Sequence, residues 1–159
     1  MEDFAPACSV KVKWPNDVMI GSRKAAGILT EGDGNNVFIG VGVNVAQSEF
    51  PEEYRSKAIS IAQAVPGMAG DIRFLLLEKI LLRLHGEIGA ASAGRNWRER
   101  LTERLYKKGE TVIFVDGAAD SKLLIEGTLT GIASGGELLI IPKGEEKERA
   151  FVTGELRVY

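Results

Sequence analysis

The sequence has very few of the residues that build metal centres and disulfides. It contains one cysteine, Cys8, and one histidine, His85, among 159 residues. A single cysteine excludes a disulfide within this chain, and one cysteine with one histidine cannot supply the ligands of a zinc site. We therefore assign no metal-binding residues from the sequence.

Neither the charge balance nor the hydropathy points to a nucleic acid or a membrane. Lysine and arginine total 20 and aspartate and glutamate total 22, so no overall basic field favours nucleic acid. The first residues lack the basic start and apolar run of a signal peptide. The longest apolar-rich stretch, Ile72–Leu84, is interrupted by charged residues and is too short to span a bilayer. We expect a soluble, cytoplasmic protein with no membrane partner.

The first part of the chain has the pattern of short strands separated by turns. In residues 8–14, Val10, Val12 and Trp14 alternate with Lys11 and Lys13, which predicts a half-buried strand with its lysines toward water. Further strands are predicted at residues 18–20, 24–31 and 37–45, with turns at Pro15-Asn16, Gly21-Ser22 and 32–36. Because residues 37–45 are too apolar to face water, we expect that strand to be central in its sheet.

The middle of the chain is predicted to be helical. Ser60 and Gln63 have the spacing of a capping box. Asp71 is a candidate cap for a longer helix, whose apolar residues recur every four positions and predict one stripe buried against a sheet. The stripe is Ile72, Leu76, Ile80, Leu84 and Ile88. A third helix is predicted over residues 96–107, with Gly109 as its stop.

After Gly109 the helical period disappears and glycines separate short strands. Strands are predicted at residues 111–115, 122–132, 137–141 and 149–158. Short strands without helices are typical of a small barrel or sandwich. We therefore place a domain boundary near residue 108, which gives domains at 1–108 and 109–159.

A lysine at the start of a strand is the strongest candidate for chemistry. If the strands before and after Gly21 form a hairpin, Lys24 returns close to the turn at Asn16-Asp17. A lysine held there could neutralise a carboxylate and an adjacent phosphate during adenylation. The alternative is a solvated edge lysine, which is the commoner case.

Asparagines and glycines at neighbouring strand positions add weaker signals. Asn16 and Asn44 lie at strand ends, where an amide could offer a donor and an acceptor to an adenine edge, or could simply favour a turn. Gly40 and Gly42 share one face of a strand. A repeated glycine favours close approach by a ligand, or equally by a packed helix.

Three motifs together resemble those of the biotin–protein ligases. They are KWPNDV at residues 13–18, KAAGILTE at 24–31 and FIGVGVNV at 38–45. The glycine-punctuated tail, with Gly154-Glu155 near its end, is similar to the family's C-terminal SH3-like domain. The resemblance implies an α+β fold: a partial mixed or antiparallel sheet with helices, like that of class II synthetases, followed by a small SH3-like β-barrel.

The resemblance also implies a reaction and a set of site residues. Ligases of this family make biotinyl-5′-AMP from biotin and MgATP, and transfer biotin to a lysine of the biotin carboxyl carrier protein of acetyl-CoA carboxylase. By resemblance Lys24 contacts the biotin carboxylate and the phosphate. The implied biotin pocket is formed by Lys24, Gly27, Leu29, Gly40 and Gly42, and the implied nucleotide site by Asn16, Asp17, Asn44 and Glu155.

The sequence departs from the family pattern in two respects. The family uses an earlier serine-threonine motif and a glycine-arginine loop, which nothing here matches. We therefore expect the chain to be the C-terminal half of a ligase and to have weak or no activity alone. Where relatives often have an arginine four positions after the Glu of the Gly-Glu motif, this sequence has Tyr159, and Arg157 is a candidate substitute.

Alternatives from other classes stay open at this point. One is a non-catalytic binding module, a remnant that docks a partner through its SH3-like domain. Another is a lipoate ligase, which has a related fold and a different acyl group. A homodimer is also left open.

Overall fold

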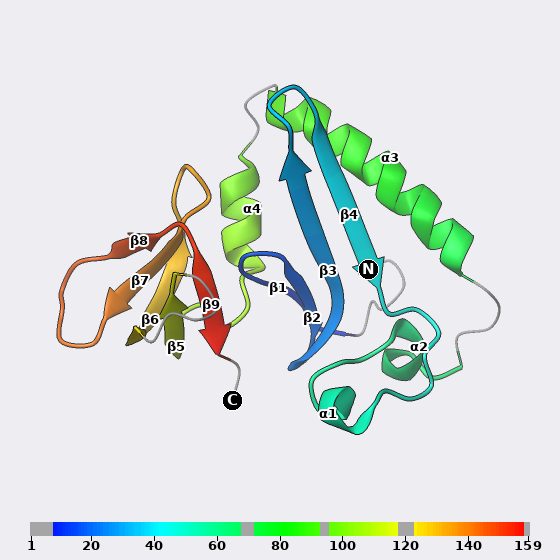
Figure 1. The fold of residues 1–159 in the computed structure, drawn as a ribbon, viewed down its shortest axis with the longest axis horizontal. Helices are drawn as coiled ribbons and strands as arrows, with labels where there is room; N and C mark the ends of the chain where they lie inside the picture. The colour runs from blue at the N-terminus through cyan, green and yellow to red at the C-terminus, as the bar shows by residue number, and fades with distance from the viewer. Residues whose placement is uncertain (1–7, 68–71, 93–95, 118–122, 158–159) are drawn as a thin grey trace.

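The computed structural model describes residues 8–67, 72–92, 96–117 and 123–157, which form an α+β fold with two antiparallel sheets (Figure 1). The first sheet has the strand order β1-β2-β3-β4. Its strands are β1 (Val10–Lys13), β2 (Asp17–Ile20), β3 (Arg23–Gly32) and β4 (Val37–Val43). These bounds confirm the strands that the sequence predicts in this part of the chain.

The position of the fourth strand differs from the prediction. Within the described ranges β4 pairs only with β3, so it is an edge strand rather than a central one. Its side chains Val37, Phe38, Ile39 and Val41 are 68%, 57%, 42% and 43% exposed. An apolar run indicates that both faces of a strand suit burial. It does not indicate which other segment packs against those faces, or whether the strand has neighbours on both sides.

Two short helices follow β4 and support the hairpin of β2 and β3. They are α1 (Glu52–Arg55) and α2 (Ile61–Ala64). The predicted capping box is confirmed: the Ser60 hydroxyl accepts from the Gln63 backbone N–H at 3.1 Å, and the Gln63 side chain accepts from the Ser60 N–H at 3.1 Å. The segment between α1 and α2 lies against β3, because the Ile59 N–H donates to the Lys24 carbonyl at 3.0 Å.

The long helix α3 (Arg73–Ser92) confirms the predicted stripe only in part. Leu76 is buried and Ile80 and Leu84 are half-buried, but Ile88 is 55% exposed. The predicted cap, Asp71, lies outside the described residues. In the part of the chain that the structure describes, no helix combines the length and the apolar content that crossing a lipid bilayer requires.

The helix predicted over residues 96–107 is shorter in the structure. Helix α4 (Trp97–Glu103) is capped at its start by Asn96, whose side chain accepts from the Glu99 N–H at 3.3 Å. The chain then leaves the helix and runs beside β1. The Val12 N–H donates to the Arg104 carbonyl, and the Tyr106 N–H donates to the Val12 carbonyl, both at 2.8 Å. These β-type bonds replace the last helical turns.

The second sheet has the order β8-β7-β6-β5-β9. Its strands are β5 (Thr111–Asp116), β6 (Leu124–Ile132), β7 (Leu138–Pro142), β8 (Arg149–Phe151) and β9 (Gly154–Arg157). The strand predicted at 149–158 is therefore two strands, β8 and β9. No pairing joins β8 to β9 among the described residues, so a closed SH3-like barrel stays a prediction.

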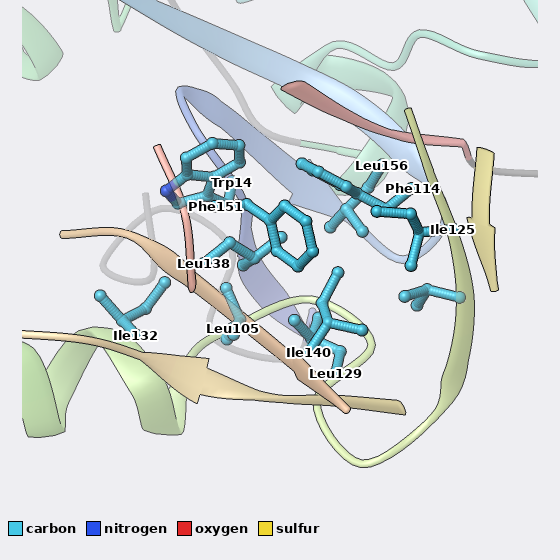
Figure 2. Packing of buried hydrophobic residues seen from close by; sticks show 11 residues of the cluster. Trp14, Leu105, Phe114, Ile125, Leu129, Ile132, Leu138, Ile140, Phe151 and Leu156 are labelled. Atoms are coloured by element: carbon cyan, nitrogen blue, oxygen red, sulfur yellow. The ribbon is translucent and has the colours of Figure 1, made fainter. Parts of the chain in front are cut away.

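The core of the second sheet includes residues from before the predicted domain boundary. Figure 2 shows Trp14 among the apolar side chains of this cluster. Leu105 belongs to the same cluster. The Trp14 indole N–H donates to the Gly136 carbonyl at 3.0 Å, and its ring centroid lies 6.1 Å from that of Phe114. In Figure 1, β1 and α4 accordingly lie between the second sheet and strands β2–β4.

Candidate functional site

One row of residues crosses all four strands of the first sheet and defines the candidate site. Lys13 on β1 is opposite Asp17 on β2, Asp17 is opposite Gly27 on β3, and Gly27 is opposite Gly42 on β4. Directly paired residues of antiparallel strands have their side chains on the same face. This face therefore carries a cation, a carboxylate and two positions without side chains, in that order.

A β-bulge brings Lys24 onto the same face. Ala26 pairs with Val18 and Lys24 pairs with Met19, so Ala25 is an extra residue on β3. An extra residue in one strand reverses the alternation beyond it and can redirect a side chain. The Lys24 ammonium consequently lies 2.5 Å from Asp17 Oδ1. The expectation that the hairpin returns Lys24 to the Asn16-Asp17 turn is confirmed.

The absence of a side chain at Gly27 makes room for Lys24. A Cβ built at Gly27 would lie 3.2 Å from both Cε and Nζ of Lys24 and 3.6 Å from Asp17 Oδ1. The lysine side chain thus lies across the backbone of residue 27. Any larger residue there would displace the ammonium rather than the sheet, because the end of a lysine side chain moves easily.

The remaining residues of the predicted biotin pocket share this face. Leu29 pairs with Gly40, two positions along the same two strands from the pair of Gly27 and Gly42 and therefore on the same face. Leu29 is 58% exposed, and a Cβ at Gly42 would meet no atom within 4 Å. The register therefore brings Lys24, Gly27, Leu29, Gly40 and Gly42 together as an open floor with a cation at one end.

The second sheet forms the wall of a cavity at the lysine end of this floor. The cavity has a volume of about 360 Å³ and is lined by residues of the KWPND turn and of β9. Its lining includes the predicted residues Asn16, Asp17, Lys24 and Glu155, together with Arg157. Arg157 shares the face of Glu155 because side chains alternate along a strand. Tyr159 lies outside the described residues.

Lys13 is a further functional candidate. The alternation along β1 predicts that its side chain faces water, and this prediction is wrong. Lys13 is 8% exposed, and its ammonium lies 3.4 Å from Glu155 Oε1. The sequence assigned the lysine face of β1 to solvent, but the second sheet covers this face at Lys13. Only a contact across 142 positions reveals this burial, and no local pattern reports such a contact.

A second cavity of about 750 Å³ adjoins the first and shares Lys13, Asp17, Lys24, Glu155 and Arg157 with it. Its lining also contains residues to which the sequence assigned no role. They include Tyr54, Lys57, Tyr106 and Lys107. Their segments lie far apart in the sequence, and the contact of the 104–106 segment with β1 places Tyr106 and Lys107 here.

The two predicted adenine residues occupy different surroundings. Asn16 is exposed, lines the smaller cavity, and its carbonyl accepts from the Ile28 N–H at 2.9 Å. Asn44 lines neither of these two cavities. Its side-chain Nδ2 donates to the Lys24 carbonyl at 3.3 Å, so it supports the backbone of the lysine.

Comparisons with known proteins agree with the motifs and the fold. Residues 5–45 match the model of the Biotin/lipoate A/B protein ligase family. The biotin–[acetyl-CoA-carboxylase] ligase of Paracoccus denitrificans is 33% identical over 135 residues, covering 77% of this chain and 54% of that protein. The apo structure of the biotin protein ligase from Aquifex aeolicus has a TM-score of 0.83 at 25% identity, covering 99% of this chain and 69% of that one. The chain is related to the biotin–protein ligases.

Further relatives define how much of a ligase this chain spans. The bifunctional ligase/repressor BirA of Bacillus subtilis is 39% identical over 83 residues, which are 46% of this chain and 26% of that protein. The Aquifex aeolicus ligase in complex with biotin and ATP has a TM-score of 0.81 at 26% identity, covering 98% of this chain and 64% of that one. The chain therefore aligns with about a quarter to a half of the curated relatives named here.

Proposed function

We propose that this chain contributes the adenylate-forming site of a biotin–protein ligase. In the proposed reaction biotin and ATP give biotinyl-5′-AMP, and biotin then passes to a lysine of a biotin carboxyl carrier protein. The observation that supports this most directly is the Lys24–Asp17 pair beside the glycine floor. The Aquifex neighbour that was solved with biotin and ATP supports the choice of substrates.

Lys24 has the charge and the freedom that the first step requires. A biotin carboxylate oxygen attacks the α-phosphorus of ATP, and the bond from that phosphorus to the leaving pyrophosphate breaks. Both reacting groups are anionic, so a cation between them stabilises the transition state by neutralising charge where it concentrates. The Lys24 side chain is 48% exposed, so it can exchange part of its contact with Asp17 for contacts to these oxygens.

The glycine floor suits the rest of biotin. Gly40 and Gly42 leave the backbone accessible to a bicyclic ligand, Gly27 makes room for Lys24, and Leu29 adds an apolar side chain on the same face. We assign biotin to this floor with its carboxylate toward Lys24. In the second step the amine of the carrier lysine attacks the acyl carbon, AMP leaves, and the amine loses a proton as the amide forms.

The nucleotide end is assigned to the turn after β1 and to the tip of the second sheet. We propose that Asn16 and Asn44 hold the adenine, that Asp17 supports the turn, and that Glu155 faces the nucleotide. Within the described ranges no cluster of three or more Asp, Glu, His or Cys residues could bind a metal ion. We therefore assign Mg²⁺ only to the phosphates of ATP and attribute no step to it.

We further propose that the 159-residue chain transfers biotin weakly or not at all by itself. The floor and β4 are open to solvent, and desolvation strengthens electrostatic contacts at an active site. We retain residues 1–108 as the catalytic part and residues 109–159 as an SH3-like part in this proposal, with the carrier protein as partner.

A ligand titration tests the assignment. A non-hydrolysable biotinyl-adenylate analogue should bind to the wild-type chain more tightly than the matching lipoyl analogue, in isothermal titration calorimetry. Lys24→Met should weaken binding by roughly 10-fold or more, since a hydrogen bond to a charged group contributes about 1.5–3 kcal/mol. Lys143→Met, which removes a lysine that pairs with Glu126 at 2.8 Å and lines neither cavity, is the matched control.

The competing functions give different outcomes in the same titration. Tighter binding of the lipoyl analogue would favour a lipoate ligase, a class that the matched family model also contains. Binding of neither analogue by a folded chain would favour a non-catalytic module. Equal weakening by Lys24→Met and Lys143→Met would remove Lys24 from the site.

A further inference from the structure

Two cations and two carboxylates meet where the second sheet joins the site. Lys24 pairs with Asp17 at 2.5 Å, and Lys13 pairs with Glu155 at 3.4 Å. All four side chains line both cavities. Three of them belong to the first sheet, whereas Glu155 comes from β9 of the second.

The register of the first sheet favours a different pairing. Lys13 and Asp17 are directly opposite on β1 and β2, and opposite charges in such positions attract. Asp17 is nevertheless paired with Lys24, and the Lys13 ammonium is held by Glu155. The side chain of Lys13 is only 10% exposed, so little water is available to replace a lost partner.

We propose that Glu155 is a positioning residue that acts through Lys13 to keep Asp17 available to Lys24. Without the Glu155 carboxylate, the Lys13 ammonium turns to Asp17, the acceptor across the strand pair. Asp17 is then shared between two lysines, and Lys24 is held less firmly. The inference rests on the proposed role of Lys24 for its functional meaning, but not for its physical test.

The second sheet fixes the backbone of Glu155, and its side chain, 66% exposed, reaches Lys13 from there. β9 pairs with β5, with Glu155 opposite Val115. At the adjoining Gly154 the φ angle is +144°, and a Cβ there would lie 2.3 Å from Phe114 Cζ and 2.4 Å from the Val115 carbonyl oxygen. Only glycine permits this close approach of β9 to β5. The folding of the second sheet is thereby coupled to the charge arrangement around Lys24.

The test measures how firmly the Lys24 ammonium is held in the unliganded chain. Its protons exchange with water more slowly while an ion pair holds them, and ¹⁵N NMR measures the rate, with the signal assigned by its loss in Lys24→Arg. We expect Glu155→Gln to accelerate this exchange by up to about fivefold, because the free energy of a cross-strand charge pair corresponds to a change of up to that size in an equilibrium constant. The double variant Lys13→Met with Glu155→Gln should restore the wild-type rate, because residue 13 then has no ammonium group to compete with Lys24 for Asp17.

The controls separate this role from a direct or a structural one. Glu126→Gln removes a half-exposed carboxylate of the same sheet that pairs with Lys143, and it should leave the Lys24 exchange rate unchanged. An unchanged rate in Glu155→Gln would overturn the proposal, and so would a raised rate that the double variant fails to restore. If Lys13→Met prevents folding, Lys13→Gln serves in the double variant.

Binding of the biotinyl-adenylate analogue provides a second readout. It should weaken in Glu155→Gln and recover in the double variant. Any recovery in the double variant supports a role through Lys13, whereas weakness that the double variant does not relieve at all would leave Glu155 only its place at the nucleotide end and would overturn this proposal. If the wild-type chain binds no analogue, the proposed function fails, but the exchange rates still decide the positioning role.

Discussion

Replacing Trp14 should destabilise the second sheet, although Trp14 lies more than ninety positions before that sheet begins in the sequence. The indole is 7% exposed and packs in the cluster that fills the second sheet. Truncation of a buried tryptophan to alanine costs about 3–5 kcal/mol through lost transfer energy and the cavity that remains. The hydrogen bond to the Gly136 carbonyl adds about 0.5–1.5 kcal/mol.

These terms predict a loss of about 3.5–6.5 kcal/mol in the free energy of unfolding for Trp14→Ala. Because domains are stable by only about 5–15 kcal/mol, this loss is a large share of the total. Trp14→Phe retains an aromatic ring without the N–H donor and should lose less, about 1–2 kcal/mol. Urea denaturation followed by circular dichroism measures both losses.

The location of the damage is the sharper test. Hydrogen exchange should increase in β5, β6 and β9 of Trp14→Ala as well as in β1. Trp97→Ala serves as the control, because Trp97 is 42% exposed and belongs to no described core cluster. A loss below about 1 kcal/mol, or normal protection of the second sheet in Trp14→Ala, would refute the view that β1 completes the second core.

Three further predictions follow from local geometry. Gly27→Ala should leave the midpoint of urea unfolding nearly unchanged but weaken binding of the biotinyl-adenylate analogue, because its Cβ would displace Lys24; unchanged binding would contradict the proposed site. Ser60→Ala removes a fully buried capping hydroxyl and should lower the free energy of unfolding by about 0.5–2 kcal/mol, as measured in urea. Hydrogen bonds from the backbone N–H groups of Asn36 and then Asn35 lower the pKa of Asp33 below its ordinary value of 3.8. The ionised carboxylate therefore stabilises the β3–β4 turn above pH 3.8, and this stabilisation is lost as the pH falls through the lowered pKa of the folded state. Hydrogen exchange of that turn at several pH values checks this sign, with Asp33→Asn as a variant that should show no such change.

Local signals in the sequence were sufficient for much of the first sheet. Alternation and turn residues gave the strands of the hairpin that returns Lys24 to Asp17. The Ser60–Gln63 capping box is predictable because both partners lie within one turn of the chain. These features depend on residues only a few positions apart, so a short stretch of sequence is enough to predict them.

Long-range contacts explain the features that the sequence did not predict. Alternation separates two faces of β1 but does not say which face another part of the chain will cover, so Lys13 was placed in water. The bulge at Ala25 has no local signature, although it decides the face on which Lys24 lies. The resemblance to the ligases identified the residues of the glycine floor, and the register of β3 and β4 then put them on one face.

The KWPND segment is informative because adjacent residues in it serve two different sheets. Lys13 points toward the site and Glu155, whereas Trp14 enters the core of the second sheet. Asp17 then returns on β2 to meet Lys24. A shift of one residue in the pairing of β1 with β2 would exchange the faces of β1, moving the tryptophan out of the core and the lysine out of the site together. Stability and charge arrangement are thus fixed by the same register, so a substitution that disturbs the Trp14 packing should also disturb the ion pair of Lys13.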